Sequence, residues 1–218
     1  GTSRRGGEGG EGVRMLAMDV TDKGTIKAAV ELVMAEQGRI DVLINNAGFG
    51  LHGEFIETSL SRELEMIDVN IRAVHILFKL FLKDFVKKNR GYILNVASSA
   101  GFLPGPLMST YYSTKSYVIR QTQAVYEELR RRKSAVNVSV LCPGPVNTEF
   151  NLRAGIEGFM KGITVEECVY YALKQMNRKK LMIIPSLKMQ LTAVAVKLAP
   201  LSVVNPVSYT LQNGKKKI

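Results

Sequence analysis

Short, nearly continuous apolar runs alternate with longer helical patterns along most of this chain. Residues 41–45 read Asp-Val-Leu-Ile-Asn, residues 91–97 read Gly-Tyr-Ile-Leu-Asn-Val-Ala, and residues 136–142 read Val-Asn-Val-Ser-Val-Leu-Cys. Strands that are buried on both faces have this composition. Strands separated by helices of this length are joined by right-handed crossovers. The alternation therefore predicts an α/β fold of three layers (α-β-α), in which a mostly parallel sheet lies between two layers of helices.

The chain has 218 residues, which suits one domain with a sizeable core. Residues 1–12 are rich in glycine and charge, so we expect them to be flexible. The α/β domain is expected to span residues 13–185, and a basic helical extension of the same domain to span residues 186–218. The remaining elements are predicted as strands at 13–18 and 181–184 and as helices at 21–37, 60–88, 109–132, 164–177, 187–198 and 201–211, with a break near Asp68-Val69.

A serine, a tyrosine and a lysine fall at positions that a parallel sheet would bring together, because ligands of such sheets bind beyond the carboxyl ends of the strands. Ser98 follows the strand at 91–97, and Tyr111 and Lys115 share one helix face because they are spaced i and i+4. A nearby ammonium favours the phenolate and lowers the tyrosine pKa from about 10. Tyr111 could then exchange a proton with a substrate oxygen that Ser98 holds by a hydrogen bond. The hydride would have to come from a cofactor, since no side chain supplies one.

Three motifs in this order resemble those of the short-chain dehydrogenase/reductase (SDR) family. They are Asn-Asn-Ala-Gly at 45–48, a serine at 98 before Tyr-x-x-x-Lys at 111–115, and Pro-Gly-Pro-Val-x-Thr at 143–148, and the resemblance covers residues 13–185. It implies a Rossmann-like fold and hydride transfer between NAD(P) and a carbonyl or alcohol substrate. It also implies that Tyr111 is the acid/base, that Ser98 stabilises the substrate oxygen, and that Lys115 lowers the tyrosine pKa and binds the nicotinamide ribose.

The resemblance implies roles for further residues. Asn70, in Asp68-Val69-Asn70, would be a fourth catalytic residue that holds a relay water near the lysine. Cofactor contacts would come from Asp19 and Val20 at the adenine, from Asn46, Ala47 and Gly48 beside the adenine ribose, and from Pro143, Gly144, Val146 and Thr148 at the nicotinamide end. Two rivals stand beside the catalytic candidates. Ser99 is the rival of Ser98, but choosing Ser98 aligns Ala100-Gly101 with the usual Ala-Gly of the family. Tyr112 is the rival of Tyr111, but it stands three residues from Lys115, whereas the family motif requires four.

The chain departs from the family at its start. The family begins with a strand and a Gly-rich turn that holds the pyrophosphate at a helix N-terminus. Residues 6–10 contain glycines, but no strand pattern precedes them and no helical pattern follows. We therefore expect an N-terminally truncated fold, in which both strands that connect the strand at 13–18 to the sheet are missing, together with the segment that selects NAD or NADP. A catalytically weak remnant that serves as a binding module is the alternative function.

Composition limits the partners. The net charge is +11, and residues 178–218 hold eight basic residues and no acidic one. Only Tyr209 lies among these basic residues, which disfavours nucleic-acid binding. The sequence contains no run of 18 apolar residues, so we predict no membrane span. Peripheral contact with an anionic membrane remains an alternative. Two cysteines (Cys142 and Cys168) and two histidines predict neither a disulfide framework nor a metal site, and they favour a cytoplasmic setting. A homo-oligomer is expected, with the C-terminal helices covering either the active site or another subunit.

Overall fold

The centre of the protein is a four-stranded parallel sheet with the order β3-β4-β5-β7. The computed structural model describes residues 1–157, 162–214 and 216–217. The strands are β3 (Val42–Asn45), β4 (Tyr92–Val96), β5 (Asn137–Leu141) and β7 (Met182–Ile183). In the register, Val42 pairs with Tyr92 and Tyr92 pairs with Asn137. All neighbouring strands are parallel, which confirms the predicted sheet.

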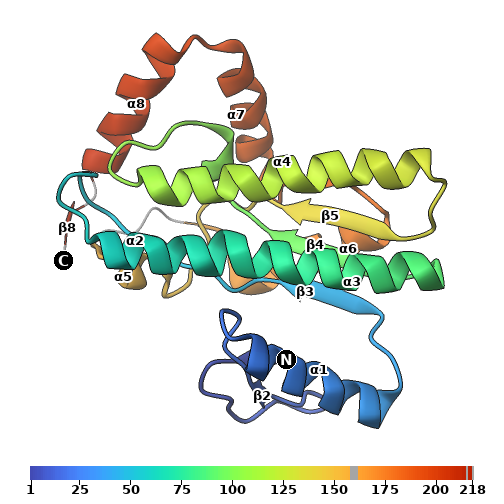
Figure 1. Cartoon of the computed structure of the whole chain (residues 1–218). Helices are drawn as coiled ribbons and strands as arrows, with labels where there is room; N and C mark the ends of the chain where they lie inside the picture. Colours follow the sequence, from blue (N-terminus) through green and yellow to red (C-terminus); the bar gives the residue numbers. More distant parts are fainter. Residues whose placement is uncertain (158–161, 215, 218) are drawn as a thin grey trace.

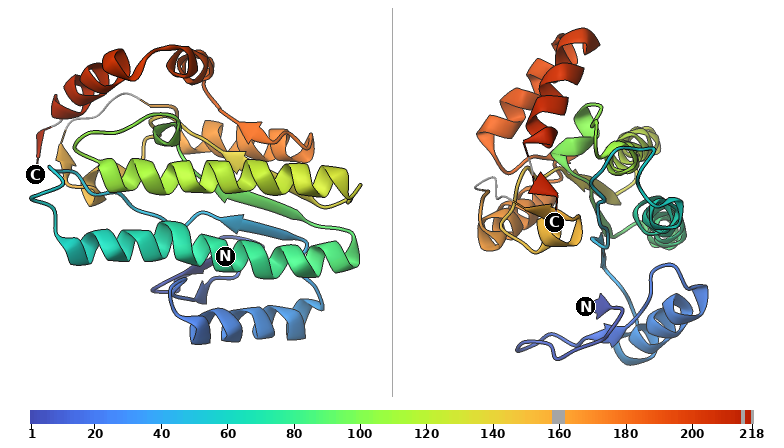
Figure 2. Two further views of the ribbon diagram at one scale, coloured as in Figure 1. Left: turned by 45° about the horizontal axis from the view of Figure 1, so that its top comes forward. Right: turned by 90° about the vertical axis from the view of Figure 1, so that its left-hand side faces the viewer.

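Helices cover both faces of this sheet (Figures 1 and 2). One face carries α3 (Val74–Lys88) and α4 (Ser109–Arg131), and the other carries α6 (Val165–Asn177). Consecutive residues of β4 show the division. Ile93 belongs to a buried cluster with residues of α3 and α4, whereas Leu94 belongs to a cluster with residues of α6. The three-layer α/β architecture is therefore confirmed.

The predicted break in the long helix at 60–88 is a π-helical segment, Asp68–Ala73, between α2 (Leu60–Ile67) and α3. A π-helical turn inserts an extra residue into the helix and is frequent at functional sites. Here it lies at the level of the strand ends and carries Asn70, whose side chain is buried. The helix thus changes its hydrogen-bonding pattern at the point where a functional residue was predicted.

The first forty residues form a small unit of two strands and a helix. Helix α1 (Lys23–Gln37) begins at the N-cap Asp22, whose carboxylate accepts a hydrogen bond from the Gly24 N–H, and ends at Gly38 with φ of 70°. Strand β2 (Leu16–Ala17) is shorter than predicted, and it pairs in parallel with β1 (Thr2–Ser3). The prediction that both strands connecting this strand to the sheet are missing, with no strand in residues 1–12, is therefore wrong for one of the two, because β1 is present. Two residues are too few for a recognisable strand pattern.

The β1–β2 pair lies beyond the β3 edge of the main sheet and forms a separate sheet (Figure 1). Among the described residues β3 has a strand neighbour on one side only, and its Val42 and Ile44 are 41% and 47% exposed. In a doubly wound sheet, the first four strands of the chain lie side by side in the order 3-2-1-4. Strands β2, β1 and β3 match positions 3, 2 and 4, and no described strand stands at position 1.

The C-terminal residues form two helices, α7 (Leu187–Leu198) and α8 (Leu201–Asn213), which arch over the end of the sheet where β4 and β5 terminate (Figure 1). Smaller elements complete this end: the 3₁₀-helix η2 (Ser99–Phe102), α5 (Phe150–Arg153), and an antiparallel pair of β6 (Ile156–Glu157) with β8 (Lys216–Lys217). No helix within the described residues has the length and apolar character needed to cross a membrane.

Candidate active site

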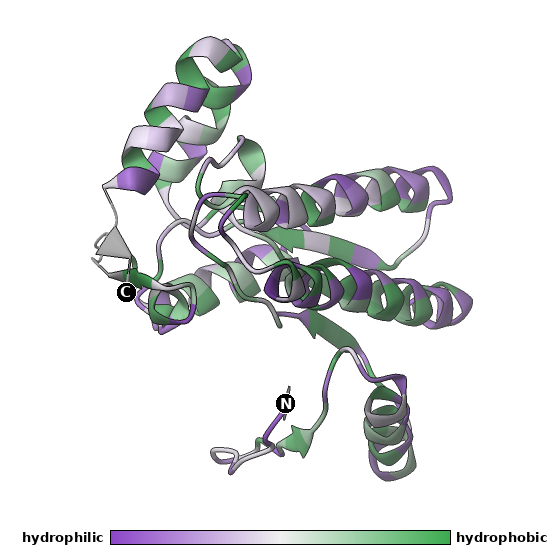
Figure 3. Cartoon of the chain, turned by 60° about the vertical axis from the view of Figure 1, so that its left-hand side comes forward, coloured by the Kyte–Doolittle hydropathy of each residue, from purple (hydrophilic) through white to green (hydrophobic). Residues whose placement is uncertain are grey.

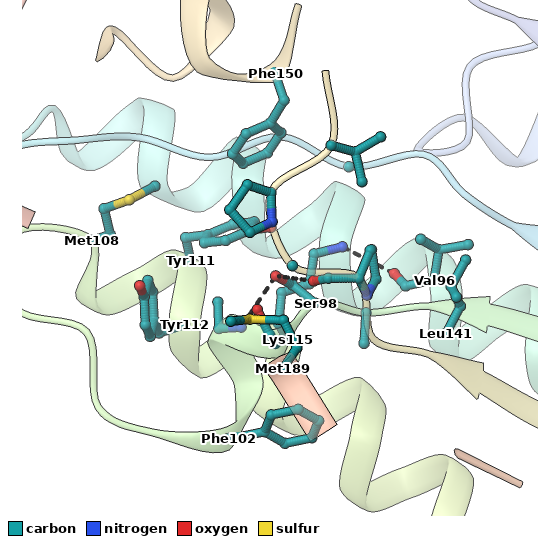
Figure 4. Close-up of a pocket in the computed structure, with 18 of the residues that line it drawn as sticks. Val96, Ser98, Phe102, Met108, Tyr111, Tyr112, Lys115, Leu141, Phe150 and Met189 are labelled. Carbon is teal, nitrogen blue, oxygen red and sulfur yellow. Dashed lines mark hydrogen bonds between the residues drawn. The ribbon is translucent and has the colours of Figure 1, made fainter. Parts of the chain in front are cut away.

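A cavity of about 690 Å³ lies beyond the carboxyl ends of β4 and β5 (Figure 4). Nine of the predicted site residues line it: Asn46, Gly48, Ser98, Tyr111, Lys115, Pro143, Gly144, Val146 and Thr148. They come from three strand ends and from the first turns of α4. The parallel sheet thus brings together side chains that are up to about one hundred residues apart in the sequence.

Ser98 lies directly beyond β4 and is the N-cap of η2. Its Oγ accepts a hydrogen bond from the Ala100 N–H at 3.1 Å and lies 3.5 Å from the Pro143 carbonyl oxygen. The same hydroxyl acts on that of Tyr111 and lowers the tyrosine pKa. These contacts single out Ser98, and not Ser99, as the serine at the tyrosine hydroxyl.

Tyr111 is buried at the start of α4, with its ring centroid 5.2 Å from that of Phe150. Burial raises the pKa of Tyr111 to about 12, the Ser98 hydroxyl acts in the opposite direction, and Tyr112 adds a smaller increase. The predicted lowering of this pKa by Lys115 is therefore absent in this structure. The cost of burying a phenolate outweighs any stabilisation of its charge.

Lys115 is also buried, and its Nζ donates a hydrogen bond to the Val96 carbonyl oxygen at 3.0 Å. The same atom lies 5.8 Å from the centre of the Tyr111 ring. Burial lowers the pKa of Lys115 to about 8, while Cys142 acts weakly in the opposite direction. A lysine on the floor of a cavity with a strongly lowered pKa is characteristic of functional sites.

Lys115→Met should stabilise the fold by about 3 kcal/mol at pH 7, because a pKa of about 8 against the ordinary 10.5 makes burial of the ammonium costly. Between pH 8 and 10.5 the unfolded chain binds more protons than the folded one, so wild-type stability should rise with pH while that of the variant stays flatter. Denaturant unfolding at pH 7 to 9.5 measures this difference. Lys83→Met, at an exposed position of α3, is the control, and parallel pH profiles for wild type and Lys115→Met would contradict the prediction.

Asn70 connects the loop after β3 to α4. Its Nδ2 donates to the Phe49 carbonyl oxygen at 2.9 Å and to Thr114 Oγ1 at 3.1 Å, and its Oδ1 accepts from the Phe49 N–H at 3.1 Å. Asn70 is not among the residues that line the cavity. The amide therefore positions the loop over Lys115 by direct contacts, and its role in holding a relay water stays a prediction.

Three predicted cofactor residues, Asp19, Val20 and Ala47, do not line the cavity. The Asp19 carboxylate accepts hydrogen bonds from the N–H and the hydroxyl of Thr21, and these bonds lower its pKa. Val20 lies in a small hollow between the N-terminal unit and the π-helical segment, beside Asp68 and Arg72. Asp19 and Val20 thus lie at the end of β2, on the far side of the open strand position from the catalytic candidates.

The cavity suits the nicotinamide end of a dinucleotide. A Cβ atom at Gly48 would lie 3.0 Å from Asn70 Oδ1 and 3.2 Å from Lys115 Nζ, so any larger residue here would crowd both side chains. Pro143, Gly144 and Val146 also line this cavity. The described residues include no Gly-rich turn between a strand and a helix N-terminus, so they offer no cradle for the pyrophosphate.

Most of the other residues that line the cavity are apolar, and they were not identified from the sequence. Phe102, Met108 and Phe150 line the cavity from three separate segments, and α7 contributes Met189 (Figure 4). Gln212 of α8 also lines it, and its Nε2 donates to the Tyr112 hydroxyl. No motif marks these residues, because single apolar side chains become a wall only through long-range packing.

Comparison with known proteins agrees with this geometry. The family model for short chain dehydrogenases matches residues 4–157. A 3-ketodihydrosphingosine reductase of Bacteroides thetaiotaomicron is 36% identical over 151 residues, which cover 69% of this chain and 55% of the relative. A short-chain dehydrogenase from Sphingobium yanoikuyae, solved in complex with NADPH, superposes with a TM-score of 0.74 at 31% identity and covers 88% of this chain and 75% of that one. The chain belongs to the short-chain dehydrogenase family.

The relatives are longer than this chain. It covers 55% of the Bacteroides reductase and 49% of a CLA biosynthesis dehydrogenase/reductase of Lactiplantibacillus plantarum, to which it is 36% identical over 142 residues. The chain thus spans about half the length of the curated relatives that it matches here.

Proposed function

We propose that this protein is an NAD(P)-dependent oxidoreductase in which Tyr111 transfers a proton to or from a carbonyl or alcohol oxygen. The observation that carries the proposal is the grouping of Tyr111, Ser98 and Lys115 in one cavity, with Lys115 Nζ 5.8 Å from the centre of the Tyr111 ring. A nicotinamide cofactor, when bound, supplies or accepts the hydride. Gly48, Pro143, Gly144 and Val146 would hold its nicotinamide end.

Ser98, Lys115 and the apolar wall of the cavity would each support proton transfer by Tyr111. Ser98 would donate a hydrogen bond to the substrate oxygen and fix it beside the Tyr111 hydroxyl. Lys115 would move from the Val96 carbonyl toward the tyrosine and lower the tyrosine pKa from about 12 when the site is filled. The apolar wall of Phe102, Met108 and Phe150 would exclude water and receive an apolar ketone or aldehyde.

The strand β1 supports a preference for NADP. Arg4 and Arg5 directly follow this strand, and β1 is the neighbour of β2. In a doubly wound fold the end of the second strand lies at the adenosine ribose, where arginine accommodates a 2′-phosphate. Arg4 also lies 3.5 Å from Glu65 of α2, which holds its side chain near the main domain.

Replacing Arg4 and Arg5 together with alanine should weaken binding of 2′,5′-ADP by about tenfold or more and change binding of 5′-AMP little, because charge-assisted bonds to the 2′-phosphate would be lost. Calorimetric titration of both nucleotides measures this selectivity. Arg14→Ala removes another exposed arginine of the same unit and is the control. An equal loss for both nucleotides would argue against recognition of the 2′-phosphate.

The proposed activity is tested by incubating the protein with NADPH or NADH and a panel of aldehydes and ketones of increasing apolar size. Cofactor oxidation that depends on the carbonyl compound supports the proposal. The competing function, a catalytically weak remnant that binds ligands, predicts substrate binding without turnover. Gel filtration with light scattering would test the predicted homo-oligomer in the same samples.

A further inference from the structure

The two C-terminal helices carry an exposed apolar surface, the outer face, formed by Leu187, Leu191, Val194 and Leu198 of α7 and by Leu201, Val203 and Val207 of α8. The α7 residues are spaced four, three and four apart, so they lie on one side of that helix. Leu191 is 73% exposed, and Leu198 and Leu201, at the turn between the helices, are 82% and 62% exposed. Figure 3 shows hydrophobic residues along these projecting helices.

The fold does not need the outer face for its own core. The contacts of α7 with the domain use its other side, where Met189, Ala193 and Val196 line the cavity. The far end of α8 is held by polar contacts, since Ser208 Oγ donates to the Pro104 carbonyl oxygen at 3.1 Å and Gln212 bonds to Tyr112. A continuous apolar surface that the chain itself leaves uncovered marks a site of interaction.

The charge of this region selects the partner. No acidic residue follows Glu167 in the sequence, and the exposed Lys188 and Lys197 lie near the two ends of α7. Within the described ranges neither lysine has an ion-pair partner. A second copy of this chain would present the same basic helices, so pairing through the outer face would oppose like charges. Negatively charged lipid supplies both an apolar phase and the opposite charge.

We propose that the outer face of α7 and α8 docks this protein on an anionic lipid bilayer. The turn with Leu198 and Leu201 enters the interface first, because it is the part of the arch farthest from the sheet (Figure 1). The lysines remain at the level of the headgroups, where their long side chains reach the phosphates. The helices lie at the surface and do not cross the bilayer.

The test is flotation of the purified full chain with vesicles of phosphatidylcholine alone or mixed with phosphatidylglycerol, at low and high salt. We expect the protein to float with the mixed vesicles at low salt, to float little with phosphatidylcholine alone, and to be partly released by salt. The double variant Leu198→Glu/Leu201→Glu should bind at least about tenfold more weakly, because it removes apolar insertion and adds negative charge. The matched control is Leu64→Glu/Leu80→Glu, which changes two exposed leucines of α2 and α3 and should bind as the wild type does.

Circular dichroism of each variant establishes that both pairs of substitutions leave the fold intact. The proposal is overturned if the wild type fails to float with anionic vesicles, or if both double variants lose binding equally. It is also overturned if Leu198→Glu/Leu201→Glu converts a dimer to a monomer in the absence of lipid, because the outer face would then be a contact between copies. None of these outcomes depends on carbonyl reduction, so failure here leaves the proposed activity untouched.

Discussion

Tyr111→Phe should lower the rate of carbonyl reduction by about three orders of magnitude, because it removes the buried hydroxyl that shares the cavity with Ser98 and Lys115. Substrate binding should change much less, since the aromatic ring and its packing against Phe150 are retained. The rate is measured by the loss of NADPH absorbance under single-turnover and steady-state conditions. A loss in kcat with little change in KM would identify a group that acts in the transition state.

The neighbouring tyrosine provides a matched control. Tyr112→Phe removes a hydroxyl one residue away, but that hydroxyl accepts its hydrogen bond from Gln212 of α8. Most of the rate should therefore remain. If Tyr111→Phe keeps full activity, or if Tyr112→Phe is the variant that loses it, the assignment of the acid/base is wrong.

Adding a strand, a Gly-rich turn and a helix in front of Gly1 should tighten NADPH binding by about 100-fold. The strand would pair with the two edges that face the open position, those of β1 and β3, and would cover the exposed Val42 and Ile44. The turn would supply backbone N–H groups and a helix N-terminus to the pyrophosphate, and two or three charge-assisted hydrogen bonds account for a change of this size. Calorimetric titration of both proteins with NADPH provides the comparison.

A version of the added unit with the turn glycines replaced by valine separates the two effects. It should raise the thermal stability, because the strand still fills the sheet, yet leave NADPH binding weak, because side chains would block the approach of the phosphates. Equally tight binding by the 218-residue chain without any addition would show that this site does not need the cradle.

Much of the fold follows from local patterns in the sequence. The strands at 42–45, 92–96 and 137–141 were predicted to within a residue or two, because strands buried on both faces have to be apolar throughout. The helix at 23–37 was recognisable from its cap at Asp22 and its stop at Gly38. The site residues were predicted on the same basis, since a parallel sheet places all its carboxyl ends at one edge, and Ser98, Tyr111 and Lys115 do meet there.

Contacts between distant segments decided the rest. Strand β1 has only two residues and is defined by its pairing with Leu16 and Ala17, so no local sequence pattern predicts it. The pKa values of Tyr111 and Lys115 follow from burial, which spacing along a helix does not reveal. Asn70 was identified by its motif, but its bonds to Phe49 and Thr114 depend on how the π-helical segment packs. The sequence by itself determined which residues gather at the sheet edge. The tertiary structure determined their hydrogen bonds, their pKa values and the apolar helices above them, because these properties depend on burial and on contacts between segments that are distant in the sequence.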